Sequence, residues 1–135
     1  MKSIAFFPAL VGALCGQAAW GQQTPAVEMT TYYMAFLYRG PNTAMPQAEA
    51  AKIQAAHMAH IGKMADSGKL ILAGPFMDNG ELRGIFVFKV GSMDEAQALT
   101  DSDPAVKAGR LKVEIRPWYS AKGIQVVKDA APKEK

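Results

Sequence analysis

Residues 69–90 read KLILAGPFMDNGELRGIFVFKV, with an apolar run on either side of a turn signal. The first run, residues 69–76, and the second, residues 83–90, have the length and composition of β-strands. Asp78-Asn79-Gly80 between them is typical of a tight turn, because Asn and Gly adopt left-handed backbone conformations most readily. The segment therefore predicts an antiparallel hairpin in the middle of the chain.

A helix is predicted on each side of this hairpin. The segment from Gln47 to Ser67 is rich in Ala, Met, Lys and Gln, and it lies between Pro46, which suits a first helical turn, and Gly68, which suits a C-terminal cap. Ser92-Met93-Asp94-Glu95 has the pattern of a capping box, which satisfies backbone N–H groups at a helix start. The second helix should run from there to about Thr100.

Two further strands, one before the first helix and one after the second, complete the expected sheet. Met29 to Arg39 is dense in Tyr, Phe, Thr and Leu and is apolar on both faces. In Leu111 to Trp118 apolar and charged residues alternate, which indicates an edge strand or a strand with one solvated face. The order strand, helix, strand, strand, helix, strand predicts an α+β, ferredoxin-like βαββαβ domain over residues 29–120. Two helices should cover one face of its antiparallel sheet.

The other face of this sheet is expected to carry large apolar side chains, especially from the first and third strands. Because an apolar patch of that size usually marks an interface, we expect a homodimer that packs sheet against sheet. Residues 121–135 form a C-terminal arm or tail. The segment from Tyr119 to Val127, which overlaps the start of this region, is a candidate for a fifth strand or an exchanged arm.

The N-terminus has the layout of a secretory signal peptide. Lys2 is followed by the apolar run from Ile4 to Leu14, and Ala19-Trp20-Gly21 suits cleavage after Gly21. We therefore expect a signal peptide at residues 1–21, a polar tether at residues 22–28, and a periplasmic or secreted protein with no membrane attachment after cleavage. A permanent N-terminal anchor is the alternative, although the apolar run is short for it.

Composition excludes several function classes. Cys15 is the only cysteine and leaves with the signal peptide, so the mature chain has no thiol chemistry. The formal net charge of +3 falls to +2 without Lys2, and no basic stripe stands out, so nucleic acid is not an expected partner. We find no glycine-rich phosphate loop, no nucleophile elbow and no zinc-ligand cluster, and we expect neither a cofactor nor a metal.

His57 is the best candidate for chemistry. A helical wheel places it near the centre of the apolar stripe of the first predicted helix, facing the sheet. An imidazole buried there needs hydrogen-bond partners. It is either a core histidine bonded to a carbonyl or tyrosine, or a general acid/base in a pocket between helix and sheet. His60, three residues on, leaves a metal pair as a weaker alternative.

Asp103 is the second candidate. Before Pro104 it suits the N-cap of a short turn that Gly109 closes, and capping alone can explain it. Its carboxylate can also orient His57 or hold the charged form of the ring, as in acid/base dyads. The two roles are compatible, because one carboxylate can cap a helix and accept a bond from an imidazole.

Candidates for substrate binding lie at the strand ends. Arg39 can pair with an anionic substrate, and the alternative is an exposed edge charge. Gly74-Pro75-Phe76 ends a strand, where glycine permits close backbone approach and Phe76 can wall a pocket; the alternative is a strand terminator. Trp118 can serve as a ligand platform, or as a core or interface residue.

Several short motifs, in order, resemble those of the YCII-related family. They are Ala56-His57-Met58, Ser67-Gly68-Lys69-Leu70, Ala73-Gly74-Pro75, Glu95-Ala96, Asp103-Pro104, Ala108-Gly109 and Arg116-Pro117-Trp118. The resemblance implies a dimeric α/β barrel and an active site built on His57 and Asp103. Some relatives are cofactor-independent enzymes of aromatic degradation, including dehydrochlorinases. The chain departs from the relatives in its export signal and in Ala105, where an aromatic residue is usual.

The sequence thus favours a cofactor-independent acid/base enzyme, of isomerase, lyase or dehydrochlorinase type, that acts on a small organic molecule. His57 is the general acid/base and Asp103 its orienting partner. The alternative is a non-catalytic module that binds a small ligand in the same pocket. A third possibility is a structural dimer in which His57 is a core group.

Overall fold

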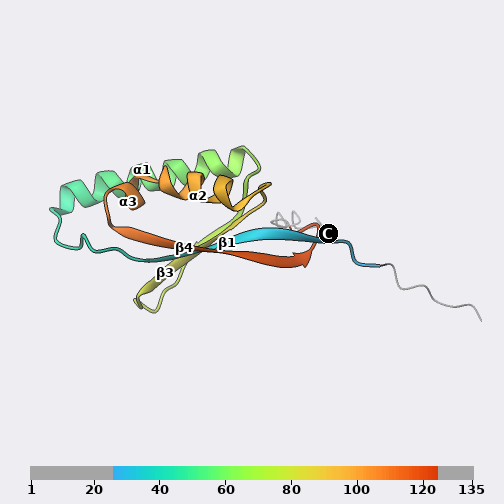
Figure 1. Cartoon of the computed structure of the whole chain (residues 1–135). Helices are drawn as coiled ribbons and strands as arrows, with labels where there is room; N and C mark the ends of the chain where they lie inside the picture. Colours follow the sequence, from blue (N-terminus) through green and yellow to red (C-terminus); the bar gives the residue numbers. More distant parts are fainter. Residues whose placement is uncertain (1–25, 125–135) are drawn as a thin grey trace, which may run out of the picture.

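The computed structural model describes residues 26–124 (Figure 1). Its elements follow the predicted order, with one short extra helix. They are β1 (Met29–Arg39), α1 (Gln47–Asp66), β2 (Leu70–Pro75), β3 (Leu82–Phe88), α2 (Met93–Asp101), α3 (Pro104–Lys107) and β4 (Leu111–Ala121). The predicted α+β, ferredoxin-like class is confirmed.

The four strands form one antiparallel sheet in the order β2-β3-β1-β4. Because β3 lies between β1 and β2, the connection through α1 is a split βαβ unit. Figure 1 shows α1, α2 and α3 on one face of the sheet and no helix on the other face. The predicted edge position of the last strand is confirmed, since β4 pairs only with β1 within residues 26–124.

The ends of α1 follow from local chemistry. Pro46 lies at the N-cap with an extended backbone, one position before the first helical turn that the sequence predicts for it. At the other end Gly68 has φ +73°, a left-handed conformation that ends a helix at little cost for glycine. Its N–H donates to the carbonyl of Ala65.

The predicted capping signal of α2 is present. The Glu95 N–H donates to the Ser92 hydroxyl over 3.1 Å, and the Glu95 carboxylate accepts from the N–H of Gly91 rather than from that of Ser92. Lys69 forms an ion pair with Glu95 at 2.8 Å. The hydrogen bonds from Lys69 and from the Gly91 N–H lower the pKa of the Glu95 carboxyl. These bonds connect the start of the β2–β3 hairpin to α2.

The hairpin turns where the sequence predicts. Asn79 has φ 58°, and the carboxylate of Asp78 accepts from the N–H of Gly80 over 3.0 Å. The strands are slightly shorter than the apolar runs, because β2 ends at Pro75 and β3 ends at Phe88.

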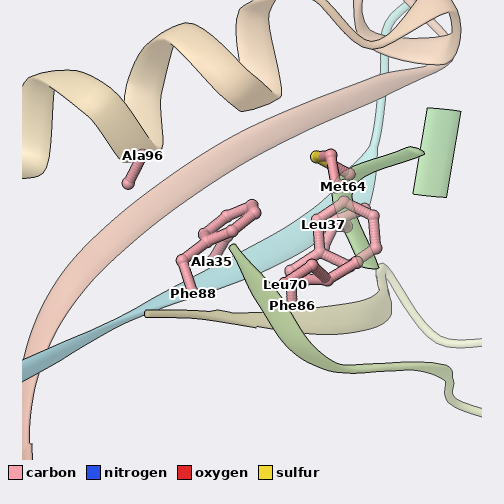
Figure 2. Packing of buried hydrophobic residues seen from close by; sticks show 7 residues of the cluster. All are labelled: Ala35, Leu37, Met64, Leu70, Phe86, Phe88 and Ala96. Carbon is pink, nitrogen blue, oxygen red and sulfur yellow. The ribbon is translucent and has the colours of Figure 1, made fainter. Parts of the chain in front are cut away.

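The core lies between the sheet and the helices (Figure 2). Sheet side chains meet Met64 from α1 and Ala96 from α2. The buried cluster consists of Ala35, Leu37, Met64, Leu70, Phe86, Phe88 and Ala96. Because side chains alternate along a strand, Met34, Phe36 and Tyr38 of β1 point away from this core.

β4 is longer than predicted. Tyr119 to Ala121 continue it, and Ala121 pairs with Met29, so these residues belong to no separate fifth strand. The remainder of the predicted arm or tail, residues 125–135, lies outside the described residues. So do the predicted signal peptide, residues 1–21, and most of the tether. No helix within residues 26–124 is long and apolar enough to span a membrane.

Candidate active site

α1 places His57 against the sheet. The predicted stripe is confirmed, because His57 and Met64 are buried while Ile53 and Ile61 are half-buried on the same helix. The His57 side chain and backbone together retain 8% of their possible exposure. The ring also stacks on Phe86 of β3, with centroids 6.1 Å apart and planes 25° apart. Helix and sheet therefore restrict the orientation of the imidazole.

Asp103 meets His57 in this layer. The Nδ1 atom of His57 lies 2.9 and 2.8 Å from the two carboxylate oxygens of Asp103, which is fully buried. Asp103 is also the N-cap of α3, and its Oδ1 accepts from the Ala105 N–H over 2.8 Å. Pro104 at the first helical position fits the same start. One carboxylate therefore both caps α3 and contacts the imidazole.

This contact indicates which ring nitrogen of His57 carries the proton and which carries the lone pair. An ionised carboxylate only accepts hydrogen bonds, so we assign the proton on Nδ1 as the donor to Asp103. In the neutral imidazole Nε2 then carries the lone pair. Among residues 26–124 no hydrogen bond reaches Nε2, and no buried side-chain nitrogen or oxygen lacks a partner. Nε2 is therefore accessible from outside the core.

His57 is one of the residues that line a cavity of about 500 Å³. The cavity lies between α1 and the ends of β1, β2 and β3, with the segment around Arg110 beside it. Arg39, Gly74 and Pro75 from the predicted binding set line it. Asp103 is fully buried and is not among the lining residues. The arrangement brings a hydrogen-bonded His–Asp pair to the wall of a space large enough for a small molecule.

The other two predicted binding residues lie elsewhere. Phe76 directly follows β2, is 41% exposed and is not among the residues that line this cavity. Trp118 lies on β4 against Tyr32, with ring centroids 6.1 Å apart, on the sheet face away from the helices. Their role in binding stays a prediction, and a ligand in the cavity would not contact Trp118 directly.

The close backbone approach predicted at Gly74 occurs at Gly84 instead. A Cβ atom added to Gly84 would lie 2.6 Å from the Gly74 carbonyl oxygen, whereas a Cβ on Gly74 would meet no described atom within 4 Å. Both residues line the cavity. The fold therefore requires glycine at position 84 on β3, whereas position 74 on β2 has room for a Cβ atom.

Ala105, the departure noted in the sequence, lies at the cavity wall. It is 3% exposed and is one of the residues that line the space. A larger residue there would occupy part of the cavity. The position of Ala105 thus contributes to the room available next to His57.

Two arginines that line the cavity were not among the residues predicted for the site. Arg83 lies at the start of β3, and Arg110 directly precedes β4. An irregularity in the pairing of β1 with β3 between Leu37 and Tyr38 changes the register close to Arg83. That irregularity leaves no mark in the sequence. Arg110 directly follows Ala108-Gly109, one of the motifs that resemble the family, and this position was the signal in the sequence that could have pointed to it.

His60 has a different environment from His57. Its Nε2 lies 2.9 Å from the carbonyl oxygen of Leu99, which links α1 to α2, and the Ser102 hydroxyl lies 3.3 Å from the same nitrogen. Within residues 26–124 we find no group of three or more His, Cys, Asp or Glu side chains placed to hold a metal ion.

Comparison with known proteins identifies a family. The model of the YCII-related domain matches residues 31–119. No curated protein sequence matches the chain. A similar solved structure is that of 5-chloro-2-hydroxyhydroquinone dehydrochlorinase from Burkholderia phenoliruptrix, in complex with 2,5-dihydroxybenzoquinone. It shares 19% identity with a TM-score of 0.46, over 66% of this chain and 93% of that chain.

Proposed function

This chain belongs to the YCII-related domain family, and from that premise and the site geometry we propose that it is an acid/base enzyme acting on a small organic molecule. One observation supports the proposal most directly. His57 bonds the buried Asp103 through Nδ1, its Nε2 makes no hydrogen bond to residues 26–124, and the residue lines a cavity of about 500 Å³. A purely structural histidine has no need of such a cavity.

The proposed step is a proton transfer by His57. Nε2 removes a proton from a carbon or hydroxyl group of the bound molecule, and the ring becomes an imidazolium. The Asp103 carboxylate at 2.8 Å stabilises that positive charge and holds the ring in one orientation. The same nitrogen then returns the proton to another atom of the substrate or to a leaving group. Isomerisation and elimination both fit this sequence, and neither requires a cofactor.

Deuterium exchange tests the proposal without knowledge of the final product. The purified protein is incubated in D₂O with a panel of small carbon acids, such as cyclic ketones and hydroxylated aromatic acids, and loss of C–H signals is followed by NMR. We expect protein-dependent exchange for at least one class, and its loss in His57→Gln. Equal exchange by the variant would contradict the assignment of His57.

The same pocket also allows a second function, as a small-ligand-binding module. Its cavity is lined by apolar, neutral polar and cationic residues, which can hold a ligand without a reaction. Under this alternative a ligand binds and His57→Gln changes its affinity, but no exchange occurs in the parent protein. The exchange measurement therefore separates the two functions.

We further propose that the protein is a homodimer that packs sheet against sheet. On the face away from the helices, Leu72 and Trp118 are 41% and 38% exposed, and Met34 and Phe36 are half-buried. An apolar surface of this kind favours association. The charged side chains Lys112, Glu114 and Arg116 of β4 lie along the same face on the edge strand and would lie near the rim.

Export is likewise a proposal. The layout of residues 1–21 supports cleavage after Gly21 and a periplasmic or secreted protein. The proposed chemistry fits this location, because it needs no thiol and no cofactor supplied by the cytoplasm.

A further inference from the structure

The charge of the cavity beside His57 points to a class of ligand. Arg39, Arg83 and Arg110 all line it, whereas its lining among residues 26–124 includes no Asp or Glu. The one described carboxylate paired with these arginines is that of Glu81, which lies 3.4 Å from the Nε of Arg39 and is 80% exposed. Water screens that pair, so the cavity retains an excess of positive charge.

The three guanidinium groups are positioned by backbone carbonyls. Arg110 donates to the Ala50 carbonyl over 2.8 Å, and Arg83 to that of Gly80 over 3.2 Å. Arg39 makes a longer contact of 3.4 Å with the Asn79 carbonyl. Each guanidinium has five N–H donors, so these bonds leave several donors for a ligand. A planar oxyanion such as a carboxylate can accept two parallel bonds from one such group.

The remaining wall of the cavity is mostly apolar, with the polar residues Asn42, Thr43 and Gln54 among its lining. Leu37, Ile61, Phe86, Ala105 and Leu111 contribute side chains to it. Burial of a hydrocarbon or aromatic body against them is favourable, and a cavity of about 500 Å³ has room for a single ring with substituents. Inorganic phosphate or sulfate would leave this apolar wall without a partner.

We propose that the cavity binds a small organic carboxylate, with its acidic group on Arg39, Arg83 and Arg110 and its apolar body beside the His57 imidazole. This inference deepens the proposed function and rests on it only for the orientation of the ligand toward Nε2. It assigns binding roles to Arg83 and Arg110. The positive charge would also stabilise negative charge that develops when His57 removes a proton.

Benzoate is a suitable probe, with benzamide as its neutral isostere and inorganic phosphate as an oxyanion without an apolar body. Binding to the purified full chain is measured by calorimetry at constant ionic strength. We expect benzoate to bind at least about tenfold more tightly than benzamide and phosphate. Arg39→Gln, Arg83→Gln and Arg110→Gln should each weaken benzoate about tenfold and leave benzamide unchanged.

Arg116→Gln is the matched control. Arg116 pairs with Glu114 on β4, is 68% exposed at its side chain and lies outside the cavity, so its loss should leave benzoate affinity unchanged. Thermal melting checks that each variant is folded. Arg110 also donates a hydrogen bond to the Ala50 carbonyl in α1, so Arg110→Gln can fail to fold. In that case the benzoate affinities of Arg39→Gln and Arg83→Gln test the inference.

Several results would overturn the inference. They are failure of benzoate to bind, equal binding of benzamide or phosphate, or an equal effect of Arg116→Gln and the cavity variants. Failure of the proposed function looks different, because benzoate would still bind in an arginine-dependent way while no carbon acid exchanges deuterium. Exchange without selective benzoate binding would instead contradict the carboxylate site alone.

Discussion

Asp103 and His57 lie 46 residues apart in the chain, yet the carboxylate of one contacts the Nδ1 atom of the other at 2.8 and 2.9 Å. The contact forms because α3 packs beside α1, and the N-cap of α3 lies opposite the third turn of α1. Asp103 therefore has a structural bond to Ala105 and a second bond to the candidate base. Substitutions can separate these two contributions.

Asp103→Asn should lower activity far more than stability. Asparagine is as good an N-cap as aspartate, so the free energy of unfolding should change by about 1 kcal/mol or less. An amide carries no charge to stabilise an imidazolium, and its NH₂ group can favour the other tautomer of His57. We expect proton exchange to fall by a factor of about 10² or more, measured by NMR in D₂O.

Asp103→Ala is the companion variant. It removes the cap, at about 1 kcal/mol, and leaves the buried Nδ1 of His57 without its partner, at about 1–3 kcal/mol. Urea unfolding at equal protein concentration should therefore show a loss of about 2–4 kcal/mol. If Asn and Ala destabilise the protein equally, the capping role assigned to Asp103 is wrong.

The two glycines at the end of the β2–β3 hairpin should differ in tolerance. Gly84→Ala places a methyl group 2.6 Å from the Gly74 carbonyl oxygen, so backbone must move, at about 1–3 kcal/mol. Gly74→Ala meets no described atom within 4 Å and should change the free energy of unfolding by about 0.5 kcal/mol or less. Equal losses in urea unfolding would mean that the hairpin pairs in a different register.

Most of the fold could be predicted from the sequence, because each element has a local signal. Met29–Arg39 has the bounds that its composition indicates, and Gly68 and the Asp78–Gly80 turn end segments by backbone preference. The far end of β4 could not be predicted this way. Its pairing with the start of β1 extends it past Trp118 to Ala121, and Pro117 is tolerated because β4 is an edge strand.

The site was predicted in part. The helical wheel gives the direction of His57, because that depends only on helical period. The meeting with Asp103 depends on how α3 packs against α1, and such a contact leaves no periodic signal in the chain. Arg83 reaches the cavity near an irregular strand pairing, and Trp118 lies on the opposite face of the sheet from it. These are results of tertiary packing.

The proposed dimer predicts a specific effect of surface charge. Leu72→Lys, on the sheet face away from the helices, should produce a folded monomer, since a charge buried at an apolar interface is costly. Met77→Lys is the control, because Met77 is 87% exposed in the hairpin turn. Light scattering after gel filtration gives the mass. A parent protein that is monomeric at all concentrations would refute the dimer.

The proposed export predicts the composition of the mature protein. Expressed with residues 1–21 in a bacterium that has a periplasm, the chain should be recovered from the periplasmic fraction with Gln22 as its first residue. It should also lack any free thiol, because Cys15 is removed with the signal peptide. Intact mass and N-terminal sequencing check both. A cytoplasmic product that retains Cys15 would contradict the expectation.

The comparison of the two histidines tests the acid/base assignment most directly. Deuterium exchange into a carbon acid that the parent protein processes is measured for the parent, His57→Gln and His60→Gln at equal concentrations of folded protein. The Nε2 of His60 is hydrogen-bonded to the Leu99 carbonyl, so we expect His60→Gln to retain the exchange rate of the parent. We expect His57→Gln to lower that rate by a factor of about 10² or more. Exchange that survives His57→Gln, or falls equally in both variants, would contradict His57 as the base.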